Sequence, residues 1–241
     1  MGVKDVFREL HDTGFFVMPN PWDVGSAVRL EGMGFKALAT TSSGHAASLG
    51  RQDQEVRFDE LCEHVTALTA AVGVPVNVDA ERLFADTPDE CATNLVTLAQ
   101  CGAAGVSVED YNPATGTIES VNVFVEKLEA CVVSARDHGI VLTARAENHL
   151  YGIDDLTDTV ARLLAFRTAG ADVVYAPGLT ESVDIGRIVD EVGGPVNVLL
   201  RESGPTVSEL AAMGVRRAST GGMLANVAYR AMQRSAQDLV L

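Results

Sequence analysis

The sequence has little positive charge and no long apolar run. Its 241 residues contain 18 Lys and Arg against 33 Asp and Glu, which gives a formal net charge of −15. This charge would repel a nucleic acid backbone, and no cluster of Lys and Arg with interleaved aromatic residues offsets it. No segment approaches the roughly 18 apolar residues of a membrane span, and the N-terminus lacks the apolar core of a signal peptide. The composition therefore predicts a cytoplasmic protein without nucleic acid or membrane partners.

Cysteine motifs and glycine-rich phosphate-binding motifs are also missing. The four cysteines are far apart in the sequence, with none of the close spacings of zinc or redox motifs, so we expect reduced thiols that pack in the core. Neither G-x-G-x-x-G nor G-x-x-x-x-G-K occurs, which argues against an open nucleotide-binding sheet. What is present is 47% hydrophobic residues, enough to bury one large core.

Short apolar segments alternate with helical patterns eight times along the chain. Most of the segments are apolar on both faces, as strands of a buried parallel sheet are. Eight units without an interrupting linker favour one domain, a (β/α)8 TIM barrel over residues 1–241. The predicted strands are Phe15–Pro19, Phe35–Thr41, Pro75–Asp79, Gly105–Glu109, Ile140–Arg145, Asp172–Ala176, Val196–Leu200 and Val215–Ser219. The predicted helices are Asp23–Met33, Asp59–Val72, Pro88–Cys101, Val121–His138, Asp154–Ala169, Glu181–Val192, Thr206–Met213 and Met223–Asp238.

Acidic residues follow three neighbouring predicted strands: Asp79 and Glu81, then Glu109, then Glu147 beside Arg145. The carboxyl ends of barrel strands converge on one rim, so these carboxylates should lie close together and repel one another. A bound Mg²⁺ or Mn²⁺ would remove the repulsion, because hard cations take oxygen ligands. In the alternative, each acid caps a helix or pairs with an arginine, the candidates being Arg82, Arg145 and Arg201.

Other polar groups near these strand ends could hold a small acid. The guanidinium of Arg145 can bind a carboxylate through two parallel hydrogen bonds, or it can pair with Glu109 or Glu147. A run of hydroxyls and backbone amides begins the long connection after the second strand and suits a carboxyl or enolate oxygen. The same run is also an ordinary turn sequence. Its residues are Thr41, Ser42 and Ser43.

Two histidines, His45 and His149, lie just beyond predicted strand ends. Each is either an acid or base of the site or an ordinary hydrogen-bonded histidine. The other three are predicted on helices away from the rim and receive no role; they are His11, His64 and His138.

Five segments, in order and on successive predicted strand ends, resemble the isocitrate lyase/phosphoenolpyruvate mutase family. They are Pro19-Asn20-Pro21-Trp22-Asp23, Ala39-Thr40-Thr41-Ser42-Ser43-Gly44 with Asp53, Val76-Asn77-Val78-Asp79-Ala80-Glu81, Val106-Ser107-Val108-Glu109-Asp110 and Thr143-Ala144-Arg145-Ala146-Glu147.

The resemblance implies a barrel enzyme that makes or breaks a C–C bond in a small 2-oxo or 2-hydroxy acid through a metal-stabilised enolate. Asp79 would be the principal metal ligand, and Asp53, Glu81 and Glu109 would hold metal-bound waters. Arg145, with Thr41, Ser42 and Ser43, would grip the substrate carboxylate, so that Arg145 and Glu109 take part in catalysis. The family exchanges its eighth helix between subunits of a dimer or tetramer, which here would be Met223–Asp238.

The sequence also departs from the family pattern. The Lys-Arg-Cys-Gly-His lid is absent, and the loop at its place runs from Tyr111 to Thr117. Arg82-Leu83-Phe84 replaces the usual Gly-Tyr-Gly and would bring a cation and two bulky groups near the site. The mutase-type histidine is replaced in the segment Tyr175–Gly178. Two alternatives to the lyase remain open: a barrel that binds a 2-oxo acid without turnover, and a hydrolase or transferase on the same scaffold.

Overall fold

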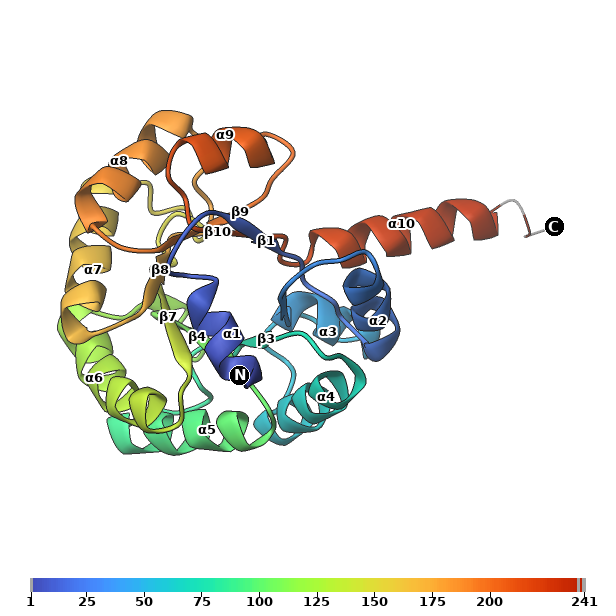
Figure 1. Ribbon diagram of the computed structural model, residues 1–241, viewed down its shortest axis with the longest axis horizontal. Helices are drawn as coiled ribbons and strands as arrows, with labels where there is room; N and C mark the ends of the chain where they lie inside the picture. Colours follow the sequence, from blue (N-terminus) through green and yellow to red (C-terminus); the bar gives the residue numbers. More distant parts are fainter. Residues whose placement is uncertain (1, 238, 240–241) are drawn as a thin grey trace.

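The structure, a computed structural model, describes residues 2–237 and 239. Eight parallel strands form a nearly closed barrel with helices between them, which confirms the predicted (β/α)8 TIM barrel (Figure 1). The structure confirms the limits of one predicted strand, Gly105–Glu109. The other strands are one to five residues shorter than predicted. The barrel strands are β1 (Phe16–Met18), β2 (Leu38–Ala39), β3 (Val76–Asp79), β4 (Gly105–Glu109), β7 (Val141–Arg145), β8 (Val173–Tyr175), β9 (Val196–Leu199) and β10 (Arg217–Ser219).

Eight helices follow these strands within about two residues of the predicted limits, as far as the structure describes the chain. They are α2 (Val24–Gly32), α4 (Phe58–Ala71), α5 (Pro88–Gln100), α6 (Val121–Asp137), α7 (Leu156–Ala169), α8 (Ser182–Val192), α9 (Val207–Ala212) and α10 (Met223–Gln237). The predicted end of the last helix, Asp238, lies outside the described residues.

Three elements were not predicted. The helix α1 (Val3–Glu9) precedes the first strand, and the helix α3 (Ser42–Ser48) occupies the start of the connection after β2, which was expected to be a loop. The connection after β4 forms a small antiparallel hairpin of β5 (Tyr111–Asn112) and β6 (Thr117–Ile118). Two of the three lie at the carboxyl ends of the barrel strands, where the site was expected.

The strand residues alternate between the helical layer and the barrel interior. On β4, Val106 and Val108 belong to the large apolar cluster that includes helix residues such as Leu95 and Phe124. The residue between them, Ser107, instead lines the cavity inside the barrel. Because side chains alternate along a strand, the same rule directs every second residue of β3, β7 and β10 inward. The main apolar core thus lies outside the barrel, and its interior is free for polar groups.

Helix α1 closes the amino-terminal end of the barrel (Figure 1). Its Phe7 is fully buried in a cluster with Phe16 and Val141, which belong to two barrel strands. The guanidinium of Arg8 donates to the carbonyl of Ile140 at 2.9 Å. The carboxyl ends of the strands are therefore the open side of the barrel.

The barrel is closed between β1 and β2 mainly by a side chain. The hydrogen-bonded strand order runs from β1 through β10 around to β2, so the two end strands share no ladder. The amide of Ala39 donates to the carbonyl of Pro19 at 3.0 Å. Nearby, Asn20 donates through Nδ2 to the carbonyl of Thr40 at 2.7 Å and accepts on Oδ1 from the amide of Thr220 at 2.8 Å. Asn20 thereby ties the ends of β1, β2 and β10 together.

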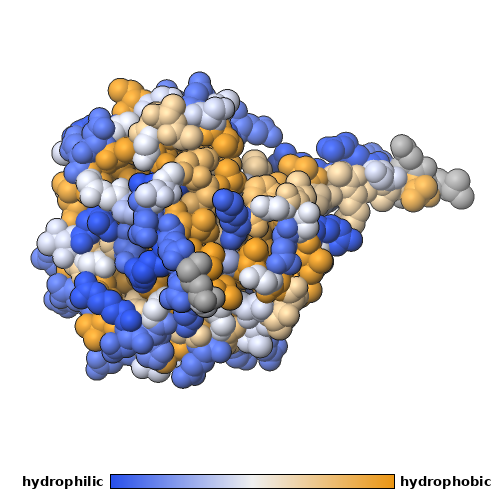
Figure 2. All heavy atoms as spheres, in the orientation of Figure 1, coloured by the Kyte–Doolittle hydropathy of each residue, from blue (hydrophilic) through white to orange (hydrophobic). Residues whose placement is uncertain are grey.

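Helix α10 leaves the barrel as a projecting arm (Figure 1). Of its described residues only Ala225 is buried, and Val227 and Met232 are 51% and 59% exposed. Figure 2 shows apolar side chains along this arm and where it meets the barrel. No helix among residues 2–237 is long and apolar enough to cross a membrane.

Candidate active site

The acidic rim forms where β3, β4 and β7 end side by side. In the ladder between β4 and β7, Glu109 lies opposite Arg145, and Asp79 on β3 lies opposite Ser107, two residues before Glu109. Each of these residues occupies an inward-facing position near the carboxyl end of its strand. The strand register therefore brings the predicted acids and the predicted arginine together.

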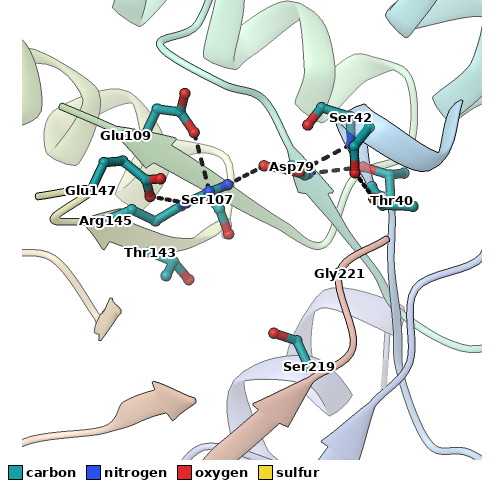
Figure 3. Close-up of polar contacts among 12 residues, drawn as sticks. Thr40, Ser42, Asp79, Ser107, Glu109, Thr143, Arg145, Glu147, Ser219 and Gly221 are labelled. Carbon is teal, nitrogen blue, oxygen red and sulfur yellow. Dashed lines mark hydrogen bonds and ion pairs between the residues drawn. The ribbon is translucent and has the colours of Figure 1, made fainter. Parts of the chain in front are cut away.

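Arg145 lies at the centre of the rim with carboxylates on three sides (Figure 3). Its Nη1 pairs with Asp79, its Nη2 lies 3.2 Å from Oε2 of Glu109, and its Nε donates to Oε1 of Glu147 at 2.8 Å. Its guanidinium carbon also lies 5.3 Å from the centre of the Tyr175 ring. The alternative expectation, that Arg145 pairs with rim acids, thus describes this structure. Its use as a substrate anchor requires it to exchange one of these partners.

Asp79 joins the rim to the segment after β2. Its Oδ2 accepts a hydrogen bond from the backbone amide of Ser42 at 3.0 Å, and its own amide donates to Oγ1 of Thr40 at 2.8 Å (Figure 3). Thr41 caps helix α3, with Oγ1 accepting from the amide of Gly44 at 3.2 Å. The predicted hydroxyl run is therefore held in one conformation at the rim, by a helix where a loop was expected.

Glu81 and Asp53 are the two rim acids for which no ion pair is found among the described residues. Glu81 is 5% exposed, and burial, followed by repulsion from Asp79 and Asp53, raises its pKa to about 8. Burial and then repulsion from Asp79 also raise the pKa of Asp53, although a hydrogen bond with Ser42 acts against this. Glu81 has a backbone φ of 49°, a left-handed conformation that costs energy in a non-glycine residue. For both acids, burial and repulsion from neighbouring carboxylates outweigh the attraction of Arg145.

Glu109 and Glu147 are almost fully buried, with side chains 4% and 1% exposed. Burial raises the pKa of both groups, and Arg145 opposes this effect. Gln54 donates through Nε2 to Oε1 of Glu109 at 3.1 Å. The sequence placed Glu147 in the acidic cluster and offered it as a partner of Arg145, but assigned it no part in metal or substrate binding. In total, the rim contains five carboxylates and one guanidinium, which contacts three of them.

The rim fits a divalent cation in its chemistry. Five carboxylates with one arginine leave an excess of negative charge, and carboxylate oxygens are the ligands that Mg²⁺ and Mn²⁺ prefer. Within residues 2–237 and 239, no three His, Cys, Asp or Glu side chains are grouped so that they could hold a metal directly. Mg²⁺ needs only one or two direct carboxylates, since it usually keeps several waters. This arrangement therefore agrees with one carboxylate that binds the metal directly and with other acids that bind it through waters.

A cavity of about 200 Å³ opens inside the barrel below the rim. This volume holds several waters, so it suits a small acid. The residues that line it include Thr41, Ser42, Ser43, Asp53, Asp79 and Arg145. Its lining also contains polar residues that the sequence did not reveal as a group: Asn77, Ser107, Asn197, Arg217 and Ser219.

Arg82 does not lie in this cavity, contrary to the expectation that its segment would place a cation near the site. It pairs with Asp86 at 2.5 Å and lies 3.7 Å from Glu119. Leu83 is fully buried in the outer core, and the ring of Phe84 packs at 5.6 Å from that of Phe58. Positive φ angles at Glu81, Leu83 and Phe84 turn the chain away from the strand direction.

The histidines and tyrosines near the rim lie behind the cavity wall or beside it. The rings of His45 and His64 stack at 3.7 Å, so His64 lies near the rim, and its expected position away from it was wrong. Both line a hollow of about 10 Å³ behind Asp79, the size of a single water. His149 lies 3.1 Å from Asp154. Tyr111 stacks on Tyr151 at 3.6 Å. None of these residues lines the main cavity.

The comparisons with known proteins agree with the rim and the barrel. The sequence model of the family described as phosphoenolpyruvate phosphomutase matches residues 7–240. The chain belongs to the phosphoenolpyruvate mutase/isocitrate lyase superfamily. This confirms the resemblance seen in the motifs. The superfamily includes lyases, mutases and a hydrolase.

Three curated superfamily relatives match most of the chain. Uncharacterized protein Rv1998c of Mycobacterium tuberculosis (strain ATCC 25618 / H37Rv) is 31% identical, over 90% of this chain and 82% of the relative. The oxaloacetate decarboxylase of Paraburkholderia xenovorans (strain LB400) is 29% identical, with 91% and 76% covered. The 2-methylisocitrate lyase of Escherichia coli (strain K12) is 26% identical, with 86% and 72% covered.

Solved structures of the superfamily share the whole barrel. A crystal structure of a candidate lyase or mutase from Burkholderia cenocepacia J2315 has a TM-score of 0.94 and 44% identity, over 98% of this chain and 87% of that chain. The crystal structure of 2,3-dimethylmalate lyase has a TM-score of 0.89 and 25% identity, over 99% and 87%.

Proposed function

We propose that this protein is a Mg²⁺- or Mn²⁺-dependent lyase that makes or breaks a C–C bond in a small 2-oxo or 2-hydroxy carboxylic acid. The observation that carries the proposal is the excess of buried carboxylates around Arg145, directly above a cavity of about 200 Å³. The 2-methylisocitrate lyase and oxaloacetate decarboxylase relatives support this reaction class.

Asp79 is the residue that we assign as the direct metal ligand, with Asp53, Glu81 and Glu109 holding metal-bound waters. A divalent cation held by these acids would neutralise the negative charge that develops on the substrate's 2-oxo group. The four carboxylates then fix the position of the cation, and their mutual repulsion falls.

Arg145 is the residue that we assign to the substrate carboxylate. In this structure Asp79 is one of its three partners. When the charge of Asp79 is taken up by a cation, the attraction between Asp79 and the guanidinium weakens, and a substrate carboxylate can replace it on Nη1. The hydroxyls of Thr41 and Ser43 lie on the same side of the cavity and can hold the second carboxyl oxygen, while the amide of Ser42 holds Asp79 in place.

The cavity lining offers few side chains that could transfer a proton. This favours a reaction in which the protein itself transfers few protons. The described residues that line the cavity include no His and no Cys, and the only phenol there, Tyr175, has its pKa raised by burial. Release of a carboxylate of a 2-oxo acid as CO₂ needs only proton delivery from water to the remaining enolate. C–C cleavage of a 2-hydroxy acid into a 2-oxo acid also needs a base that removes the hydroxyl proton. The same lining supports the alternative of a barrel that binds the acid without turnover.

The test is to incubate the purified protein and Mg²⁺ with a panel of 2-oxo and 2-hydroxy acids and to measure release of pyruvate, glyoxylate and CO₂. We expect release from at least one acid and its loss on removal of the metal with EDTA. Asp79→Asn should reduce turnover at least about 1,000-fold, whereas Asp190→Asn, the same change on exposed α8, should not. Tight oxalate binding without any product would instead support the binding-only alternative.

Assembly is the second part of the proposal. We infer that α10 packs on a second copy of the chain in a homodimer or homotetramer. The arm exposes Val227 and Met232, and Val24 and Val28 on the neighbouring α2 are 39% and 48% exposed. Tyr229 on the arm faces Trp22 with ring centres 6.3 Å apart, which marks where the arm leaves the barrel. An apolar face of this kind is stabilised when a partner covers it.

A further inference from the structure

The barrel interior below the acidic rim contains a polar layer. Its inward-facing residues are nearly fully buried, and each is at most 6% exposed. Interiors of such barrels are normally filled with bulky branched apolar side chains. A polar layer at this position departs from that rule, and such departures occur at functional sites. The residues of the layer are Asn77, Ser107, Thr143, Asn197 and Arg217.

Arg217 supplies the charge of this layer and has only neutral partners. Its Nε donates to Oδ1 of Asn197 at 2.8 Å, its Nη2 to Oγ1 of Thr143 at 2.9 Å, and its Nη1 to Nε2 of His11 at 3.1 Å. Within the described part of the chain, no carboxylate forms an ion pair with it. A guanidinium has five N–H donors, so these three bonds leave two unused.

A buried cation without a counter-charge is costly to keep in a folded protein. Arg217 is 1% exposed and is the largest of the fully buried side chains. Burial lowers its pKa to about 9, and the effect of Tyr175, which acts in the opposite direction, is too small to offset the loss of water. Arg8, Arg145 and Arg162, in contrast, each pair with at least one acid. Arg217 therefore lacks an anion at a place where the cavity can supply one.

The cavity reaches this arginine. Arg217, Asp79 and Arg145 all line the same 200 Å³ space. Thr143, which holds the guanidinium, precedes Arg145 by two residues on the same face of β7, a separation of about 7 Å along the strand. Asn77 also lines the cavity, and its buried Oδ1 has no partner. The cavity thus has a negative rim and a positive floor.

We propose that Arg217 forms a second anion site at the floor of the cavity, one side-chain layer below Arg145, which binds a carboxylate or another small monovalent anion. The two unused N–H donors of the guanidinium match the two oxygens of a carboxylate. The rim acids repel an anion and Arg217 attracts it, so a negative group in the cavity is directed to the floor. The anion is either the second carboxylate of a substrate, a use that rests on the proposed function, or a free anion such as formate.

The anion site is tested first without metal, so that the lyase activity plays no part. Thermal unfolding of the full chain in EDTA is measured against formate, with ionic strength held constant by a bulky sulfonate that does not fit the cavity. We expect a saturable rise in Tm, because a ligand that binds only the folded state stabilises it. Arg217→Gln should abolish the rise. Arg216→Gln removes the neighbouring arginine, which donates to the carbonyl of Gly14, and should retain it.

A measurement on the unmutated protein covers the case in which Arg217→Gln does not fold. Crystals of the metal-free protein soaked in bromide should show an anomalous peak within hydrogen-bond distance of the Arg217 guanidinium. Absence of this peak, or a formate response that is equal in the unmutated protein and Arg217→Gln, overturns the proposal. Loss of lyase activity alone, with the metal-free anion binding intact, would refute only the proposed function.

Calorimetry in the presence of Mg²⁺ distinguishes the two possible sources of the anion, a substrate carboxylate and a free anion. If a substrate carboxylate fills the site, formate competes with malonate but not with pyruvate, and Arg217→Gln weakens malonate binding about 10- to 100-fold. If a free anion fills it, formate and malonate bind together, and the variant loses formate binding alone. Either result supports the site, whereas unchanged binding of both ligands in Arg217→Gln contradicts it.

Discussion

The carboxamide oxygen of Asn20 accepts a hydrogen bond from the backbone amide of Thr220, 200 residues later in the chain. The same oxygen accepts from the amide of Gly221 at 2.9 Å, and the amide nitrogen donates to Thr40. Asn20 is 5% exposed, so water cannot replace these bonds. The asparagine of the first family motif therefore has a structural role, because it closes the barrel where no strand ladder does.

Asn20→Asp should lower the free energy of unfolding by about 2–4 kcal/mol, measured by urea denaturation at pH 7. The change replaces the donor to Thr40 with an acceptor and buries a charge without a cation partner. Asn122→Asp, on the exposed first turn of α6, is the matched control and should change stability by less than about 0.5 kcal/mol. Equal losses in the two variants would contradict the closing role of Asn20.

Gly44→Ala should destabilise the protein by about 1–3 kcal/mol. A Cβ at this position would lie 2.5 Å from Cγ2 of Thr41 and 3.2 Å from Cβ of Trp22, which is too close for either group. Gly32→Ala on α2 is the control, since nothing lies within 4 Å of its added Cβ. The control should be neutral or more stable by up to about 1 kcal/mol, because alanine favours helix. Thermal and urea unfolding of both variants distinguish these outcomes.

His64 should contribute stability that is lost as the pH falls below about 6.5, whereas acids with a raised pKa, such as Glu81, act in the opposite direction. Burial and then the adjacent His45 lower the pKa of His64 from 6.5 to about 3. The unfolded chain binds the proton near pH 6.5 and the folded chain does not. The contribution of His64 is thus fully present above pH 6.5 and is lost, by up to about 1.4 kcal/mol per unit, as the pH falls toward 3.

Urea denaturation at several pH values measures this effect. Between pH 6.5 and 5, the stability of His64→Gln relative to that of the unmutated protein should rise as the pH falls, since the titrating group is gone. His138→Gln removes an exposed histidine and should leave the slope unchanged. A slope in His64→Gln equal to that of the unmutated protein would show that the buried imidazole becomes protonated without loss of stability.

Arg82→Gln should leave KM and kcat within about twofold, because the side chain pairs with Asp86 outside the cavity. The Nε atom of Arg82 is buried without a hydrogen-bond partner, so the substitution breaks no bond at this atom. It should cost no more than about 1–2 kcal/mol of stability. The comparison is with Arg145→Gln, which should remove activity. Steady-state kinetics with the acid that proves to be the substrate test this prediction. A large rise in KM for Arg82→Gln would show that Arg82 contributes to substrate binding.

Val227→Glu and Met232→Glu should dissociate the assembly, because each places a charge on the exposed apolar face of α10. Light scattering after gel filtration measures the mass of each variant. Gln233→Glu adds the same charge at an exposed polar position and should preserve the assembly. An unmutated protein that is monomeric at all concentrations would refute the role that we propose for α10.

The strands were predictable because their outward faces, which pack against the helices, leave a clear apolar signal, although the inward faces that were expected to be apolar are largely polar. Val106 and Val108 face the helices, and the barrel needs such residues on every strand. Helix α3 was missed because Ser42-Ser43-Gly44 is typical of turns. It is a helix here because Thr41 caps it and Trp22 packs against Gly44. A local sequence signal could not reveal that packing, since Trp22 comes from the other side of β2.

The rim residues were predictable from strand ends, but the directions of some side chains were not. Arg82 follows the metal motif directly, yet left-handed residues on both sides of it turn it outward. Arg217 was overlooked because it stands at the start of its strand, away from the rim, where neither spacing nor motif marks it. Its importance depends on its neutral partners and on the cavity beside it, which only the folded chain brings together.

The strand order of the barrel also determines when it can be completed during protein synthesis. In the sheet described, β1 has one hydrogen-bonded neighbour, β10 (Arg217–Ser219), which is synthesised after every other strand of the barrel. Until then β1 has no strand partner, and His11 has no arginine to hold it at the barrel floor. A nascent chain that stops before Arg217 should therefore remain open at both the first strand and the amino-terminal helix. All eight strands must therefore be synthesised before the ring can close.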